Sequence, residues 1–361
     1  MARDGLKWMD SDMHLAEPGD LWDKYIEPEL RDNIVDWTGV TPDYNVLTRS
    51  TIPAIEQIRS TRTHLLLDYV SADGKCIDPA GQLKAMDTEG IDVAILFPTA
   101  GRRTRTSDPG AIASLHRAYN SWLHDFCAYE PLRLKLNAIV SILDVEAAVA
   151  EVRRVASELG AVSVSIEGQT DATRFYDPMY EPLWAEAERH GITIGLHNFV
   201  QTFGRYADRP TAVYSHALGR PIEHACAFTE LLFGGVLERH PRLRFVFLEA
   251  GCSWLPYWLF RLEEEWEKFL PIDEELARNV TMPPIEYWRR QCWTSVEVDE
   301  WPLRSVVDIV GGDNLVLSSD FPHFDSAFPH ARDRFMAIPG VGVESKRKIL
   351  WDNCARLYNL G

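Results

Sequence analysis

Short runs of apolar and β-branched residues recur along the chain, and most are bounded by glycine, asparagine, aspartate or proline. Residues 93–97 and 245–248 are apolar throughout, which is typical of parallel strands covered on both faces. The pattern predicts eight strands, over residues 9–14, 93–98, 134–142, 162–166, 192–197, 243–248, 291–298 and 315–319.

Helical patterns separate these runs. The clearest covers residues 144–159, where apolar residues recur at three- and four-residue spacing between a capping Asp144 and a terminating Gly160. Comparable patterns predict helices over residues 109–129, 178–189, 221–239, 254–269, 303–310 and 344–358.

The alternation of strand and helix decides between two architectures that a length of 361 residues allows. Eight alternating units favour one (β/α)8 TIM barrel over residues 1–361, rather than an open doubly wound sheet with a second domain. Residues 15–91 are too many for a single crossover, and they predict an insertion after the first strand. Because it follows the C-terminal end of a strand, we expect it to overhang the barrel mouth as a lid.

Polar residues stand where several predicted strands end, and such positions face the mouth of a barrel. The period of two along the first strand predicts that Asp10, Asp12 and His14 share one side. His197 ends the fifth strand and Asp320 follows the eighth, which adjoins the first in a closed barrel.

Each of these residues alone fits an ordinary turn, cap or buried histidine. Together, Asp12, His14, His197 and Asp320 predict one divalent metal ion with an open position for water or substrate. Two carboxylates and two imidazoles are compatible with zinc, which we expect first, and with manganese or iron.

Three segments carry a resemblance to a known family: residues 10–18 (DSDMHLAEP), 240–251 (HPRLRFVFLEAG) and 318–323 (SSDFPH). They resemble the amidohydrolase superfamily, in the branch related to aminocarboxymuconate-semialdehyde decarboxylase. The resemblance implies a barrel with a single metal ion, used for decarboxylation, hydration or hydrolysis of small carboxylated compounds. It also implies a homodimer.

Two positions depart from that family. Asp12 stands where the family often has the first histidine of a His-x-His pair, and Glu249 stands where its decarboxylases commonly carry a proton-moving histidine. Glu249 is therefore the candidate general base or acid. His224 is an alternative source of the missing imidazole, although it equally fits a packing role. Residues 166–168 contain no metal-bridging lysine, which favours one ion.

Three further residues are candidates for substrate binding. Arg102 and Arg103 follow the second strand and are placed to bind a substrate carboxylate, or are ordinary surface arginines. Trp254 adjoins a mouth position and could pack on a planar substrate, although an aromatic residue there is often part of the core.

Composition and charge exclude several classes of protein. Hydrophobic residues make up 46% of the chain and charged residues 25%, as in globular proteins. The 37 basic and 54 acidic residues give a net charge of −17, which opposes nucleic-acid binding. We expect no membrane span, because no apolar run approaches the ~18–20 residues that one needs. The N-terminus lacks the apolar segment of a secretion signal. The six cysteines form no C-x-x-C pair, as expected of reduced thiols in a cytoplasmic protein.

The function that we expect is metal-dependent, non-oxidative decarboxylation of a small cyclic or unsaturated carboxylate. A hydrolase or hydratase in which Glu249 deprotonates metal-bound water is the alternative enzyme. A barrel that binds metal and ligand without catalysis is the alternative from another class.

Overall fold

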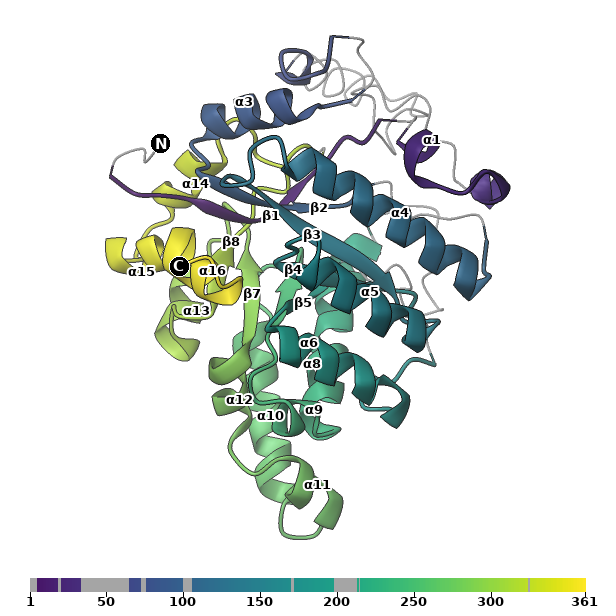
Figure 1. Ribbon diagram of the computed structural model, residues 1–361. Helices are drawn as coiled ribbons and strands as arrows, with labels where there is room; N and C mark the ends of the chain where they lie inside the picture. Colours follow the sequence, from purple (N-terminus) through teal and green to yellow (C-terminus); the bar gives the residue numbers. More distant parts are fainter. Residues whose placement is uncertain are drawn as a thin grey trace.

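Eight parallel strands form one sheet whose spatial order follows the chain (Figure 1). In the computed structural model, each strand pairs in parallel with the next. The strands are β1 Met9–His14, β2 Val93–Phe97, β3 Leu134–Ser141, β4 Ser163–Glu167, β5 Thr193–His197, β6 Phe245–Leu248, β7 Cys292–Val296 and β8 Leu315–Leu317.

The first and last strands meet, so the sheet is a nearly closed barrel. The backbone N–H of His14 donates to the Phe321 carbonyl at 2.7 Å, and that of Asp320 donates to the Asp12 carbonyl at 3.2 Å. The Ser11 hydroxyl donates to the Leu317 carbonyl at 2.9 Å. The predicted (β/α)8 barrel is thus confirmed, and the sheet is not an open doubly wound one.

Helices surround the sheet (Figure 1). The main helix between each pair of consecutive strands is, in order, α3 Pro79–Glu89, α4 Pro109–Cys127, α5 Val145–Ser157, α6 Glu181–His190, α8 Arg220–Phe233, α10 Leu255–Phe269 and α13 Leu303–Val310. The other helices are α1 Trp22–Tyr25, α9 Val236–Arg239, α11 Glu274–Asn279, α12 Pro284–Gln291, α14 Ala331–Ala337, α15 Val343–Arg347 and α16 Asn353–Leu357. Short 3-10 helices lie at η1 Pro28–Asn33 and η3 Pro178–Tyr180, and short π-helical segments lie at η4 Ser215–Gly219 and η5 Lys348–Asp352.

Local sequence explains where these helices begin. The Asp144 carboxylate accepts a hydrogen bond from the Ala147 N–H at 3.0 Å, as the predicted cap requires. Asp108 caps α4 in the same way, and Pro109 occupies its first turn. The last residue of α5 is Ser157, so this helix is two residues shorter than predicted.

The structure describes residues 5–18, 21–33, 65–72, 76–99, 106–169, 172–197, 213, 215–323 and 325–361. Much of the predicted insertion at 15–91 therefore lies outside the described residues, and its role as a lid stays a prediction. Its described parts include α1, η1 and α3.

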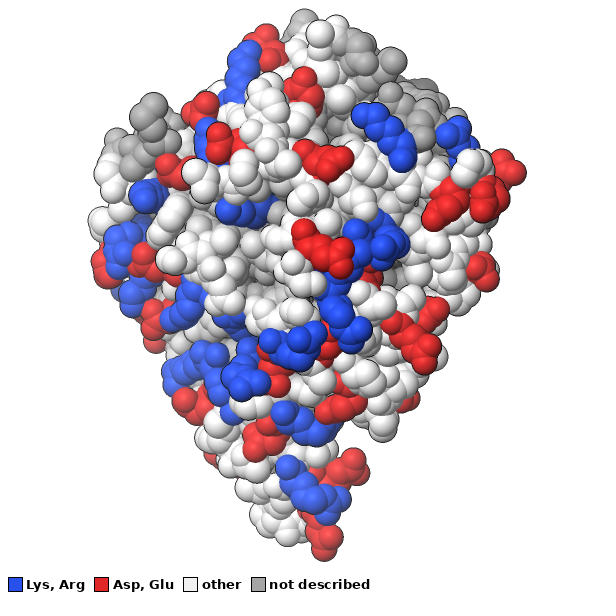
Figure 2. All heavy atoms as spheres, viewed as in Figure 1, with Lys and Arg blue, Asp and Glu red and all other residues white. Residues whose placement is uncertain are grey.

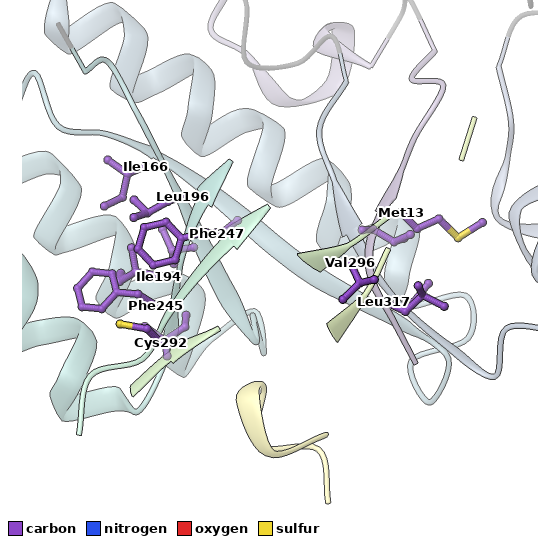
Figure 3. Packing of buried hydrophobic residues seen from close by; sticks show 14 of the residues in the cluster. Met13, Ile166, Ile194, Leu196, Phe245, Phe247, Cys292, Val296 and Leu317 are labelled. Atoms are coloured by element: carbon purple, nitrogen blue, oxygen red, sulfur yellow. The ribbon is translucent and has the colours of Figure 1, made fainter. Parts of the chain in front are cut away.

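Strand residues alternate between two apolar layers. In β6, Phe245 and Phe247 belong to the layer between the sheet and the helices, while Val246 and Leu248 pack inside the barrel with Ile95. Figure 3 shows part of the outer layer, with Ile166, Ile194 and Phe247 from neighbouring strands. The same alternation determines which side of the sheet a polar side chain at the end of a strand faces.

The surface in Figure 2 mixes acidic and basic side chains without a broad basic field on that face. Among the described residues, no helix has both the length and the apolar character needed to span a bilayer. All six cysteines are free, and four of them are buried.

Candidate metal centre

Five ionisable side chains meet at the C-terminal ends of four strands. Asp12 and His14 end β1, His197 ends β5, Glu249 immediately follows β6, and Asp320 follows β8. Asp12 and His14 are fully buried, and His197 and Glu249 nearly so. We call these five residues the mouth cluster; the structure brings together all four predicted metal ligands and the predicted base.

The imidazole nitrogens lie at the centre of the mouth cluster. His14 Nε2 is 3.3 Å from Asp12 Oδ1, 3.4 Å from Glu249 Oε1 and 3.5 Å from Asp320 Oδ1. His197 Nε2 is 3.1 Å from His14 Nε2, 3.5 Å from Asp12 Oδ2 and 3.4 Å from Glu249 Oε1. Metal–ligand bonds of ~2.1 Å separate neighbouring ligands by roughly 3.0–3.4 Å, so these spacings suit the edges of a coordination shell.

The residues present fit a divalent cation. One ligand atom each from Asp12, His14, His197 and Glu249 lies within 4.8 Å of the others, and a second such group joins His14, Glu249, Asp320 and His323. Neither buried carboxylate oxygen of Asp12 accepts a hydrogen bond within the described part of the chain. Buried carboxylates without donors are costly unless a cation compensates them.

Contacts around β1 hold the His14 ring in place. Thr99 Oγ1 lies 3.2 Å from His14 Nδ1, on the far side of the ring from Nε2. The Glu17 carboxylate accepts hydrogen bonds from the Thr99 N–H at 2.8 Å and from the Tyr119 hydroxyl at 3.0 Å. Such outer contacts fix the orientation of a ligating imidazole.

Asp10 belongs to neither group of candidate ligand atoms, unlike Asp12 and His14. The register of β1 against β2 shifts between Asp10 and Met13. Asp10 Oδ1 instead accepts hydrogen bonds from the Asp12 N–H at 3.2 Å and the Ser319 N–H at 3.0 Å. Burial raises the pKa of Asp10 to about 7. This residue therefore braces β1 against the segment after β8.

Glu249 has an unusual backbone and a charged partner. Its φ is 63°, and its N–H donates to the Ser295 hydroxyl at 3.1 Å. Its Oε2 lies 3.0 Å from Nη2 of Arg220, the first residue of α8. Burial alone would raise the pKa of Glu249, but His197 and Arg220 outweigh it and lower that pKa well below its ordinary value.

Asp320 also has a left-handed backbone, with φ of 53°. Its Oδ1 lies 2.6 Å from His323 Nδ1, and the His323 ring lies 4.0 Å from that of His14. Burial and the charge of Glu249 raise the pKa of Asp320 well above its ordinary value. The side chains of Asp320 and His323 are each 16% exposed, so this pair faces the open side of the cluster.

Charge is unevenly distributed in this site. Burial, followed by the charges of Glu249 and Asp320, raises the pKa of Asp12 well above its ordinary value. Burial and the charge of His323 lower the pKa of His14 well below its ordinary value, so the imidazole of His14 is kept neutral. The three carboxylates of the mouth cluster therefore have one guanidinium beside them, that of Arg220. A divalent cation would bring the net charge of these groups to zero.

The remaining predicted site residues lie elsewhere. His224 is fully buried on α8, with its ring 5.6 Å from Phe247 and 6.4 Å from Trp254. Burial, with the charge of His197, lowers the pKa of His224 to about 3. The Trp254 indole donates to the Gly251 carbonyl at 3.1 Å and packs against the core. Arg102 and Arg103 lie outside the described residues.

Sequence reasoning missed three residues that contact the mouth cluster or its supports. His323 and Glu17 lie within the quoted segments 318–323 and 10–18, so their polar character beside strand ends was an available signal. Arg220 follows residues 198–219, where no strand or helix pattern is evident, and nothing in the sequence indicated its role.

Comparisons with known proteins agree with this geometry. A family model described as "Amidohydrolase" matches residues 10–360. A gamma-resorcylate decarboxylase from Rhizobium radiobacter is 28% identical over 291 residues, which cover 77% of this chain and 86% of that protein. A 2-amino-3-carboxymuconate-6-semialdehyde decarboxylase from Dictyostelium discoideum is 24% identical, over 79% of this chain and 76% of that protein.

Solved structures show the same fold. The dihydroxybenzoic acid decarboxylase of Polaromonas sp., crystallised with manganese and the inhibitor 2-nitroresorcinol, superposes with a TM-score of 0.69. The two proteins are 19% identical over 98% of this chain and 97% of that one. The resemblance noted in the sequence is confirmed.

Proposed function

Because the chain belongs to the amidohydrolase family of enzymes, we propose that it is a metal-dependent decarboxylase that releases carbon dioxide non-oxidatively from a small aromatic carboxylate. The observation that carries this proposal is the mouth cluster itself, a buried set of three carboxylates and two imidazoles in a chain whose relatives are carboxy-lyases. Gamma-resorcylate and dihydroxybenzoate, named for relatives, supply the substrate class.

One divalent ion would be held by Asp12, His14, His197 and Asp320. We propose manganese ahead of zinc, because carboxylate oxygens are ligands that suit manganese and because the Polaromonas structure contains manganese. When bound, the ion polarises substrate oxygen atoms as a Lewis acid.

The proton that replaces the carboxylate must come from a group that is protonated near neutral pH. The sequence predicts Glu249 for this step, with His224 as the alternative. The Arg220 ion pair favours the ionised form of Glu249, and His224 is packed among aromatic rings. We therefore assign the proton to the hydrogen-bonded pair of Asp320 and His323 at the open side, whose Oδ1 and Nδ1 atoms lie 2.6 Å apart. It passes to the ring carbon, which keeps the electron pair of the broken C–C bond.

Substrate recognition completes the proposal. Arg102 and Arg103 would hold the carboxylate in a charge-assisted contact, and Trp254 would limit the space for a planar ring. We also keep the predictions of a homodimer and of a cytoplasmic location. The second agrees with six free thiols, which suit a reducing compartment.

The test incubates manganese-loaded protein with hydroxybenzoates and muconate-type acids while carbon dioxide is measured. In deuterium oxide, we expect one deuterium at the carbon that lost the carboxylate. Asp320→Asn should abolish release, whereas Asp308→Asn, a matched change at an exposed aspartate on α13, should retain it.

A hydrolase is the second candidate, favoured by one observation. An ionised Glu249 beside the ion-binding residues suits removal of a proton from water better than donation to carbon. If the products contain added water and no carbon dioxide is released, the enzyme is a hydrolase and not a decarboxylase.

A further inference from the structure

Glu249 lies as close to the two imidazoles as Asp12 does. Its Oε1 is 3.4 Å from both His14 Nε2 and His197 Nε2, while the oxygens of Asp12 are 3.3 and 3.5 Å from the same atoms. A base that acts on a metal-bound water contacts the water and stands outside the ligand shell. The equal spacing instead gives Glu249 and Asp12 the same relation to the centre of the mouth cluster.

The backbone after β6 brings the carboxylate there. Alternation along β6 directs Phe245 and Phe247 toward the helices and Leu248 into the barrel, so a regular strand would send residue 249 toward the helices. A φ of 63° at Glu249 breaks that alternation, in a region that non-glycine residues rarely adopt. The fold therefore maintains an unfavourable conformation that directs this carboxylate inward.

Arg220 occupies the other oxygen of the same carboxylate. Its Nη2 lies 3.0 Å from Glu249 Oε2, and its side chain is only 14% exposed. The other carboxylates whose charges act on it are Asp320, Asp325 and Glu297. With Oε2 paired to the guanidinium, Oε1 is left facing the imidazoles.

We propose that Glu249 is itself a ligand of the metal ion, joining Asp12, His14, His197 and Asp320, and that Arg220 is the positioning residue that aims its Oε1 at the ion. This inference rests on the proposed metal centre but not on decarboxylation. The proposal also gives Arg220 an electrostatic role. Three ligating carboxylates carry one negative charge more than a divalent ion neutralises, and the guanidinium supplies the remaining positive charge.

The first test measures manganese binding to metal-free protein by calorimetry, without substrate. Glu249→Gln should weaken binding at least tenfold, because it replaces an anionic ligand with a neutral one. The control Asp308→Asn removes an exposed carboxylate on α13 that lies outside both ligand groups and should change affinity less than twofold. Equal affinities for wild type and Glu249→Gln would overturn the proposal.

Folding is checked separately. Glu249→Asp keeps the charge but withdraws the oxygen by one methylene, so it too should weaken binding. Each variant must show wild-type circular dichroism in the metal-free state before its affinity is used. Because no substrate is present, the result stands even if no acid in the panel is decarboxylated.

The second test concerns Arg220. Cobalt(II) in place of manganese gives a visible spectrum that responds to its ligands. Arg220→Met should alter this spectrum, and adding Glu249→Gln to it should cause no further change, because both substitutions remove the same ligand. A wild-type spectrum in Arg220→Met would rule out the positioning role.

Discussion

Two buried charged clusters in this molecule satisfy their carboxylates in opposite ways. Between α4 and α5, Glu151 accepts hydrogen bonds from Arg154 Nη2 at 2.6 Å, Arg154 Nε at 2.8 Å and Asn120 Nδ2 at 2.8 Å, and it pairs with Arg117 at 3.2 Å. In the mouth cluster, three carboxylates share one arginine, and Asp12 accepts no hydrogen bond from the described residues.

The difference separates a structural cluster from a functional one. The chain itself supplies the positive charge that Glu151 needs, so this cluster is complete once the protein folds. In the proposed metal centre, the mouth cluster would be complete only with a cation from solution. An excess of buried carboxylates over their partners, more than burial itself, is therefore the feature that supports an ion-binding site here.

The largest effect is expected when the mouth cluster loses Asp12. Asp12→Ala should lower manganese affinity at least ~100-fold and abolish carbon dioxide release, because it removes an anionic ligand and leaves both imidazoles without their shared carboxylate. Elemental analysis of dialysed protein measures the bound metal. Stoichiometric manganese in this variant would contradict the ligand set, while Glu151→Gln serves as the control that should keep its metal.

A smaller effect is expected in the structural cluster. Glu151→Ala should lower the free energy of unfolding by about 2–3 kcal/mol, because it leaves the largely buried Arg154 without its carboxylate. Urea unfolding measures this change, and manganese affinity should stay at the wild-type value. Glu158→Ala, at an exposed glutamate at the end of the same helix, should change stability by less than ~0.5 kcal/mol. If Glu151→Ala lost metal binding, the two clusters would not be independent.

A third effect, which appears only as pH changes, concerns Asp10. Its pKa is about 7 in the folded protein against an ordinary value of 3.8. A carboxyl group with a raised folded pKa favours folding while it is protonated, and this contribution is lost as pH rises from about 4 to 7. Asp10→Asn keeps an oxygen for the Asp12 and Ser319 N–H groups but does not titrate. Metal-free wild type should therefore lose a few degrees of Tm relative to this variant across that pH range. If the Tm difference between wild type and Asp10→Asn did not change with pH, the protonation of Asp10 would not contribute to stability.

Much of the fold could be predicted because its causes are local. Alternating apolar runs and capped amphipathic helices predicted the barrel, and strand ends predicted that Asp12, His14, His197 and Asp320 would meet. Two local irregularities had no signal in the periodic pattern. The register of β1 shifts between Asp10 and Met13, and Glu249, which the sequence analysis did place at the site, has a left-handed backbone.

The role of Arg220 had no local signal at all. It lies 29 residues before Glu249 in the sequence, and only the packing of α8 beside β6 brings the two together. The same holds for Thr99 and Tyr119, which reach Glu17 and His14 across more than 80 residues.

The sequence by itself determined the barrel and the residue types at its mouth, because hydrophobic periodicity and strand ends are properties of neighbouring residues. Only the tertiary structure decided which carboxylates face the imidazoles and which one is paired with an arginine. Those relations depend on a few ångströms and on the sum of charges in a buried space, and side chains from four strands and a helix contribute to both.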